Sequence, residues 1–155
     1  MFLLLCSAFF SACEVAYFSL NSLQLNEMSE KKGRLGRLVN SLLDKPRELL
    51  ITIYIGNEFV NIAISVVVTS VAISMFGSIG VGIAIGFSTM LLLIFGDIIP
   101  KSISIKFAQP YALFSAYPLK GFAKLVQPAQ KFFTVWTEKI IGAMGILPQS
   151  VKKST

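Results

Sequence analysis

The sequence predicts an all-α membrane protein with three transmembrane helices and a belt of amphipathic helices on the cytoplasmic side. Hydrophobic residues make up 54% of the 155 residues and charged residues only 14%. A soluble chain of this length cannot bury that much apolar surface. The apolar residues are gathered into three stretches, and all fourteen Lys and Arg lie outside those stretches or at their ends.

The three apolar stretches lie at about 1–22, 49–76 and 79–100. Each is long enough to cross a bilayer as a helix, which takes about 20 residues. The second is longer than needed, so we expect it to tilt or to extend beyond the lipid. Only Gly77 and Ser78 separate the second stretch from the third. Because so short a connection allows only a tight turn, these two spans are expected to form a hairpin.

The basic residues predict the orientation. Six Lys and Arg lie in residues 23–50, eight lie from Lys101 onward, and none lies in the turn between the second and third spans. By the positive-inside rule, the 23–50 segment and the C-terminus face the cytoplasm and the N-terminus lies outside. We therefore expect a multi-pass protein of the plasma membrane, which in a bacterium is the inner membrane.

Two segments outside the spans, at about 23–48 and 107–147, combine basic and apolar residues at helical spacing. This spacing predicts amphipathic helices that lie along the cytoplasmic interface. They could serve as simple anchors or in gating, and the spacing favours neither. The net charge of +6 indicates a preference for anionic lipids of that leaflet. Because the basic residues are dispersed beside the spans, we expect no nucleic-acid binding.

One acidic residue stands inside each span: Glu14, Glu58 and Asp97. A carboxylate in hydrocarbon is costly unless it is protonated, paired, hydrated or bound to a cation. Three acids on three spans therefore suggest a buried cation site. Two alternatives stay open: Glu58 could be hydrated near the cytoplasmic end of its span, and Asp97 could pair with Lys101 one turn away.

Other oxygen-bearing side chains lie on the same helical faces. Ser7, Ser11 and Glu14 share a face of the first span, and Asn57 and Asn61 share a face of the second. Carboxylate, hydroxyl and amide oxygens suit magnesium, calcium or sodium. The chain has no His, so we expect no zinc, copper or iron site. For Ser7, a hydrogen bond to a neighbouring helix is the alternative explanation.

The third span carries Gly96, Asp97 and then Pro100. Pro100 has no backbone donor and clashes with the carbonyl of Gly96. We expect the helix to break here and to free that carbonyl for a ligand. Irregular backbone at membrane depth is tolerated where it lines a cavity or is buried in protein.

Three segments carry a resemblance to a known family: Ser11-Ala-Cys-Glu-Val-Ala16, Gly56-Asn-Glu-Phe-Val-Asn61 and Gly96-Asp-Ile-Ile-Pro-Lys101. In this order and at these separations they resemble the transmembrane domain of the CNNM/CorC family of magnesium transporters, over essentially the whole chain. The resemblance implies a homodimer that exports Mg²⁺, coupled to Na⁺ entry. Family members continue into cytoplasmic CBS domains, whereas residues 1–155 are expected to form a single transmembrane domain without them.

The resemblance also implies which residues hold the transported Mg²⁺. By motif these are Ser11, Gly96, Asp97 and one of two asparagines, Asn57 or Asn61, between which the motif does not choose. Two further acids, Glu14 and Glu58, would be sodium ligands or acids just outside the magnesium ligands.

Asp97 departs from the family, which usually has Glu at this position. Its side chain is one methylene shorter, and Mg²⁺ demands nearly octahedral geometry at about 2.0–2.1 Å. Either the helix shifts inward, or a water fills the gap, or affinity and selectivity differ.

Two functions of other classes are alternatives to transport. One is a membrane anchor or ion-sensing module for a missing cytoplasmic domain. The other is an intramembrane protease, which commonly uses His for serine or zinc chemistry, or two acids that share a proton. The chain has no His, and Asp97 is the only Asp within a span. We therefore expect no enzymatic activity.

Overall fold

The computed structural model describes residues 1–145, and all the regular elements in that range are helices. They are α1 (Phe2–Phe18), α2 (Ser22–Lys31), α3 (Arg34–Leu43), α4 (Pro46–Phe76), α5 (Gly80–Leu91), α6 (Ile99–Lys106) and α7 (Ala108–Ala143), with a 3₁₀ turn η1 (Gly77–Ile79) and a π-helical stretch η2 (Leu92–Ile98). The predicted all-α fold is confirmed over these residues. The last two residues of the predicted belt, 146–147, lie outside them.

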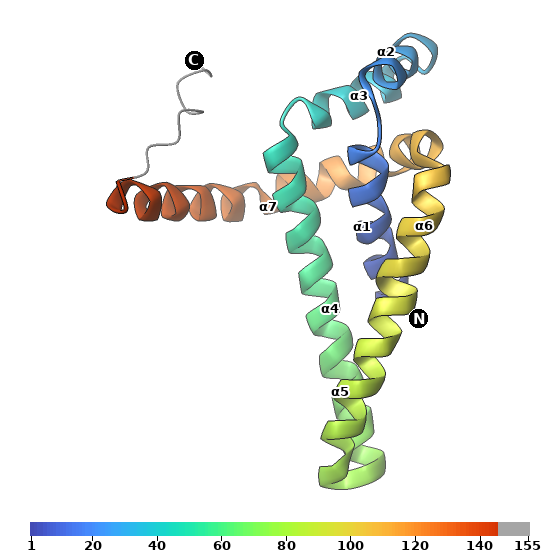
Figure 1. Ribbon diagram of the computed structural model, residues 1–155, viewed down its shortest axis with the longest axis vertical. Coiled ribbons are helices and arrows are strands. Elements are labelled where there is room, and N and C mark those ends of the chain that lie inside the picture. The colour runs from blue at the N-terminus through green and yellow to red at the C-terminus, as the bar shows by residue number, and fades with distance from the viewer. Residues whose placement is uncertain (146–155) are drawn as a thin grey trace.

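The arm α4 and the arm formed by α5, η2 and α6 make a long hairpin (Figure 1). Pro46 lies in the first turn of α4, where its missing N–H needs no helical partner. Gly77 ends that helix with φ of 64°, a conformation that glycine adopts without steric cost. The tight turn therefore lies where the sequence predicts it.

The stretch Pro46–Lys106 is long and apolar enough to cross a membrane, with a mean hydropathy of 2.2. It contains both arms of the hairpin, because the backbone stays helical through η1. α1 passes the same test only together with α2, from which it is bent by 104°. The described residues thus provide at least one apolar span, and three crossings stay a prediction.

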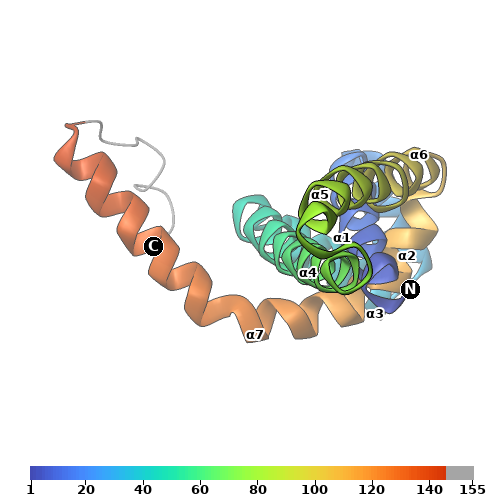
Figure 2. The ribbon, with the colours of Figure 1, turned by 90° about the horizontal axis from the view of Figure 1, so that it is seen from below.

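Amphipathic helices surround one end of the hairpin. α2 packs against α3, and α3 packs against α7, which lies across α4 (Figures 1 and 2). Pro118 and Pro128 lie inside α7 without ending it, although Figure 2 shows that this helix changes direction along its length. Far along α7, the large apolar side chains of Phe132 and Trp136 are exposed.

The apolar core lies where α1, α3, α4 and α7 meet. The ring of Phe10 lies between α1 and α4, with ring centroids 5.5 Å from Phe9 and 5.1 Å from Phe122. A Cβ added to Gly56 would lie 2.5 Å from that ring. Only glycine therefore permits this close approach. Tyr17 adds a second constraint, because its buried hydroxyl donates to the carbonyl of Ala112 at 2.9 Å and joins α1 to α7.

We predict that Gly56→Ala destabilises the fold by about 1–3 kcal/mol, the usual cost of overpacking. The new methyl group must displace Phe10, which is only 8% exposed. Gly86→Ala is the matched control, because a Cβ there meets nothing within 4 Å. Thermal unfolding in detergent micelles measures both changes. If Gly56→Ala and Gly86→Ala had equal melting temperatures, the contact between α1 and α4 would not depend on Gly56.

Candidate cation site

Three layers of polar contacts join α1 to the two arms of the hairpin. They are centred on Ser7, Ser11 and Glu14 of α1. These residues follow one another at helical spacing, so they lie on one face of α1. Figure 1 shows α1 between α4 and α6, which places that face against both arms.

Ser7 forms the first layer. Its hydroxyl donates to Asn61 Oδ1 at 2.7 Å and lies 3.4 Å from Asn57 Oδ1. On the other side, a Cβ added to Gly96 would lie 3.0 Å from Ser7 Oγ. Ser7 is buried, and both asparagines are half-buried. The expected hydrogen bond from Ser7 to a neighbouring helix is therefore present, and it brings both candidate asparagines and Gly96 together.

Ser11 forms the second layer. Its hydroxyl, which is fully buried, donates to Asp97 Oδ1 at 2.6 Å and so joins α1 to η2. This distance lies at the short end of the normal range for a hydrogen bond between two oxygen atoms. Among the described residues, no Lys or Arg forms an ion pair with Asp97.

Glu14 forms the third layer. Its carboxylate lies 3.4 Å from the ammonium of Lys101 and accepts a hydrogen bond of 3.2 Å from the Tyr54 hydroxyl. The alternative in which Lys101 pairs with Asp97 is therefore wrong. Neither partner of Glu14 was predicted from the sequence, although the spacing contained a signal for Lys101. If Ser11 faces Asp97, the next turn of each helix brings Glu14 to Lys101.

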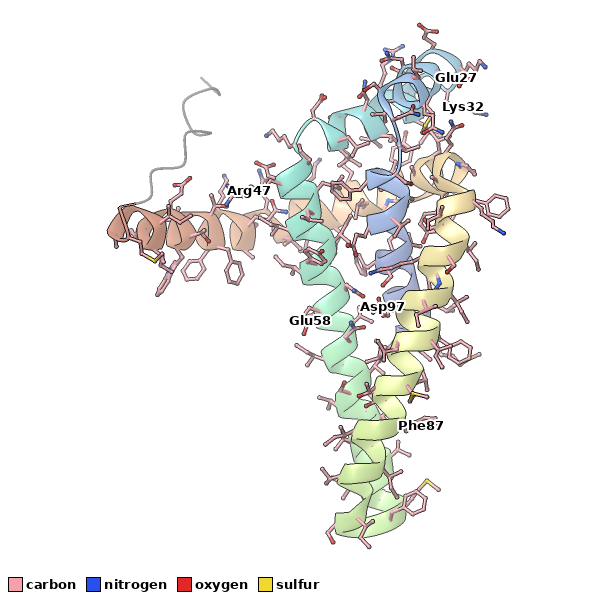
Figure 3. All side chains as sticks on the ribbon, viewed as in Figure 1. Glu27, Lys32, Arg47, Glu58, Phe87 and Asp97 are labelled. Carbon is pink, nitrogen blue, oxygen red and sulfur yellow. The ribbon has the colours of Figure 1, made fainter. Side chains whose placement is uncertain are left out.

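The three acids do not meet at one point. Glu58 is exposed, and Figure 3 shows it on the outer side of α4, whereas Asp97 lies between the two arms. Within residues 1–145, no three His, Cys, Asp or Glu side chains are close enough to hold a metal ion together. A cation in this cluster would therefore be held by one carboxylate and by neutral oxygens.

The prediction that the third apolar helix breaks at Pro100 is wrong. The chain stays helical but widens over η2, where the N–H of Ile99 donates to the carbonyl of Ile94, five residues earlier. Pro100 is the second residue of α6 and directly follows this widened turn, and local π-helical adjustments are one way in which a membrane helix accommodates the missing N–H of a proline. Gly96 and Asp97 both lie in the widened turn. Single π-helical turns of this kind occur frequently at functional sites.

Comparison with known proteins assigns this chain to a family. A family model described as the cyclin M transmembrane N-terminal domain, CNNM, matches residues 1–155. The chain belongs to this family. The resemblance found in the three motifs is thereby confirmed, and the chain is a membrane domain.

The chain is 32% identical over 143 residues to a UPF0053 protein of Haemophilus influenzae and 33% identical over 140 residues to the UPF0053 inner membrane protein YfjD of Escherichia coli. These alignments cover 92% and 90% of this chain but only 34% and 33% of the relatives. A DUF21 domain-containing chloroplastic protein of Arabidopsis thaliana is 32% identical over 93% of the chain and 22% of its own length. The chain thus spans at most about a third of these relatives.

We predict that Glu14 and Lys101 are energetically coupled. Glu14→Gln or Lys101→Gln alone leaves one charged group without its partner, whereas the double variant removes both charges. In a double-mutant cycle measured by unfolding in micelles, the pair should be less destabilised than the sum of the singles by about 1 kcal/mol.

The control cycle uses Glu27→Gln and Lys31→Gln, an exposed pair within α2, for which we expect no measurable coupling. Additive effects at Glu14 and Lys101 would contradict the contact between α1 and α6.

Proposed function

We propose that this chain is the membrane domain of a transporter that exports Mg²⁺ across the plasma membrane, driven by Na⁺ entry. The observation that carries the proposal is the convergence of oxygen atoms from three helices. Ser11 contacts Asp97 at 2.6 Å, and one turn away Ser7 lies between Asn57 and Asn61. Membership in the CNNM family supports an ion-transport role for this cluster.

In this proposal, Mg²⁺ is bound by oxygens of Ser11, Asn57 or Asn61, and Asp97, with the backbone of Gly96 beside them. The ion takes over the carboxylate oxygen to which Ser11 now donates, and the serine then offers a lone pair instead of its proton. With only one carboxylate, the site compensates half of the ionic charge, and Mg²⁺ keeps part of its water shell. Binding of such moderate strength suits transport, because the ion must also leave.

The shorter side chain of Asp97 is compatible with this role. It reaches Ser11 directly across the interface between η2 and α1. Each of the three alternatives for an Asp in place of Glu is consistent with this contact.

The proposed topology has three crossings, formed by α1, by α4 and by α5–η2–α6. The N-terminus lies outside, and α2, α3 and α7 lie at the cytoplasmic face. The basic residues support this arrangement, because seven of the fourteen lie in those three helices and none lies in the hairpin turn. The proposal includes a homodimer and cytoplasmic CBS domains in the full-length protein, and no enzymatic activity.

Two acids are the candidates for the Na⁺ step. Glu14 is held by Lys101 and Tyr54 next to the Mg²⁺ ligands, which suits an acid that senses the occupancy of the site. Glu58 is exposed on α4, which suits a hydrated entry position.

A second candidate function is an anchor or ion-sensing module for a separate cytoplasmic domain. The length of the relatives favours this function, because the alignment with this chain covers only about a third of each bacterial relative. An anchor needs no ion flux through the domain, so transport assays separate the two functions.

We predict that Asp97→Asn lowers Mg²⁺ flux into or out of proteoliposomes by about ten-fold or more, because it removes the only charged ligand. Ser11→Ala should lower the flux as well. Asp44→Asn makes the same chemical change at an exposed corner between α3 and α4 and should leave the flux unchanged. Unaltered flux in both site variants would disprove the site, and flux indifferent to an imposed Na⁺ gradient would disprove the coupling.

We predict that Mg²⁺ raises the melting temperature of the purified chain more than equal concentrations of Na⁺, Ca²⁺ or Mn²⁺. A ligand that binds only the folded state adds about 2.7 kcal/mol of stability at one hundred times its Kd. The Mg²⁺ shift should disappear in Asp97→Asn and persist in Asp44→Asn. A pure anchor would show no Mg²⁺ shift in any of the three proteins.

A further inference from the structure

A basic cavity of about 260 Å³ lies at the corner where α3, α4 and α7 meet. Figure 1 shows these three helices converging above the hairpin. Lys45, at the start of α4, lines the cavity together with Lys120 and Lys124 of α7. Glu48, 3.7 Å from Lys45, is the single acid in the lining. The lining therefore carries a net charge of about +2, and it shares no residue with the cation site.

The walls of this cavity are fixed by contacts between helices. Gln130 of α7 is 7% exposed, and its amide donates to the hydroxyl of Thr52 and, at 3.1 Å, to the carbonyl of Glu48. Leu49, which also lines the cavity, is buried in the core. The cavity is therefore a built feature of the folded chain, and its lining includes polar and basic residues as well as apolar ones.

The surroundings place the cavity at the level of lipid headgroups. Farther along α7, the exposed aromatic side chains of Phe132, Phe133 and Trp136 lie between Lys131 and Lys139. A helix of this composition lies in the membrane interface, with its apolar face toward the acyl chains and its basic face toward the phosphates. Lys120 and Lys124 are one turn apart on the same helix and thus face the same way.

We propose that this cavity binds the phosphodiester group of an anionic phospholipid of the cytoplasmic leaflet. Lys45, Lys120 and Lys124 contact the phosphate. The apolar lining residues Leu42, Leu49 and Ala123 lie along the glycerol backbone. Basic pockets between membrane helices on the cytoplasmic side bind anionic headgroups in this way. The proposal rests on the proposed orientation of the domain and is independent of magnesium chemistry.

The test uses the intact chain in zwitterionic detergent micelles, in which no charged leaflet attracts basic residues in general. Phosphatidylglycerol, phosphatidylcholine with the same acyl chains, and glycerol 1-phosphate are titrated separately, and Kd and melting temperature are measured. We expect phosphatidylglycerol to bind with saturation and to stabilise the chain, and the other two compounds to bind at least ten-fold more weakly. The triple variant Lys45→Gln, Lys120→Gln, Lys124→Gln should bind phosphatidylglycerol about 100-fold more weakly, since each lysine near an anionic surface accounts for about five-fold.

The matched control is Lys106→Gln, Lys131→Gln, Lys139→Gln, which removes the same charge from residues that do not line the cavity. Equal losses in the two triple variants would overturn the site, because the effect would then be one of net charge. Equal affinity for glycerol 1-phosphate would overturn the lipid in favour of a soluble phosphate compound. Displacement of the lipid by an added acidic peptide, with tighter binding of that peptide, would overturn it in favour of a protein segment. Asp97→Asn should retain lipid binding, which separates this test from that of the magnesium site.

Discussion

The packing of α1 between the two arms of the hairpin is the constraint on which the other contacts depend. On one side, Gly56 lets the ring of Phe10 approach the backbone of α4. On the other side, the hydroxyl of Ser104 donates to the carbonyl of Ala12 at 2.6 Å and holds α6 against α1. Because both interfaces are close, short side chains such as serine can reach polar partners on two different helices.

The same periodicity that predicts helices also predicts which residues share a face, so Ser7, Ser11 and Glu14 could be grouped from the sequence. Their partners could not be assigned, because periodicity fixes a face but not the rotation and axial shift of one helix against another. Glu14 is the example: its pairing with Lys101 depends on the register between α1 and α6. The family motifs supplied the candidate residues, while the contacts between layers come only from the packed structure.

The effect of the prolines on the helices could not be predicted from the local sequence either. A proline inside a helix removes one hydrogen bond and clashes with the preceding turn, which predicted a break at Pro100. The chain instead widens into η2 before Pro100, and α7 continues through Pro118 and Pro128. In α7, Leu119 and Val126 are buried against the rest of the structure, and this tertiary packing offsets the local cost.

Charge balance then distinguishes the three acids of the spans. Glu14 is compensated by Lys101, and Glu58 is exposed. Asp97 has the hydroxyl of Ser11 but no basic partner among residues 1–145. A carboxylate at membrane depth without a basic partner is costly unless it is protonated, hydrated or bound to a cation. Asp97 is thus the acid of the three that lies next to Ser11, one turn of α1 from the contacts of Ser7 with Asn57 and Asn61, which is why the proposed cation site is centred on it.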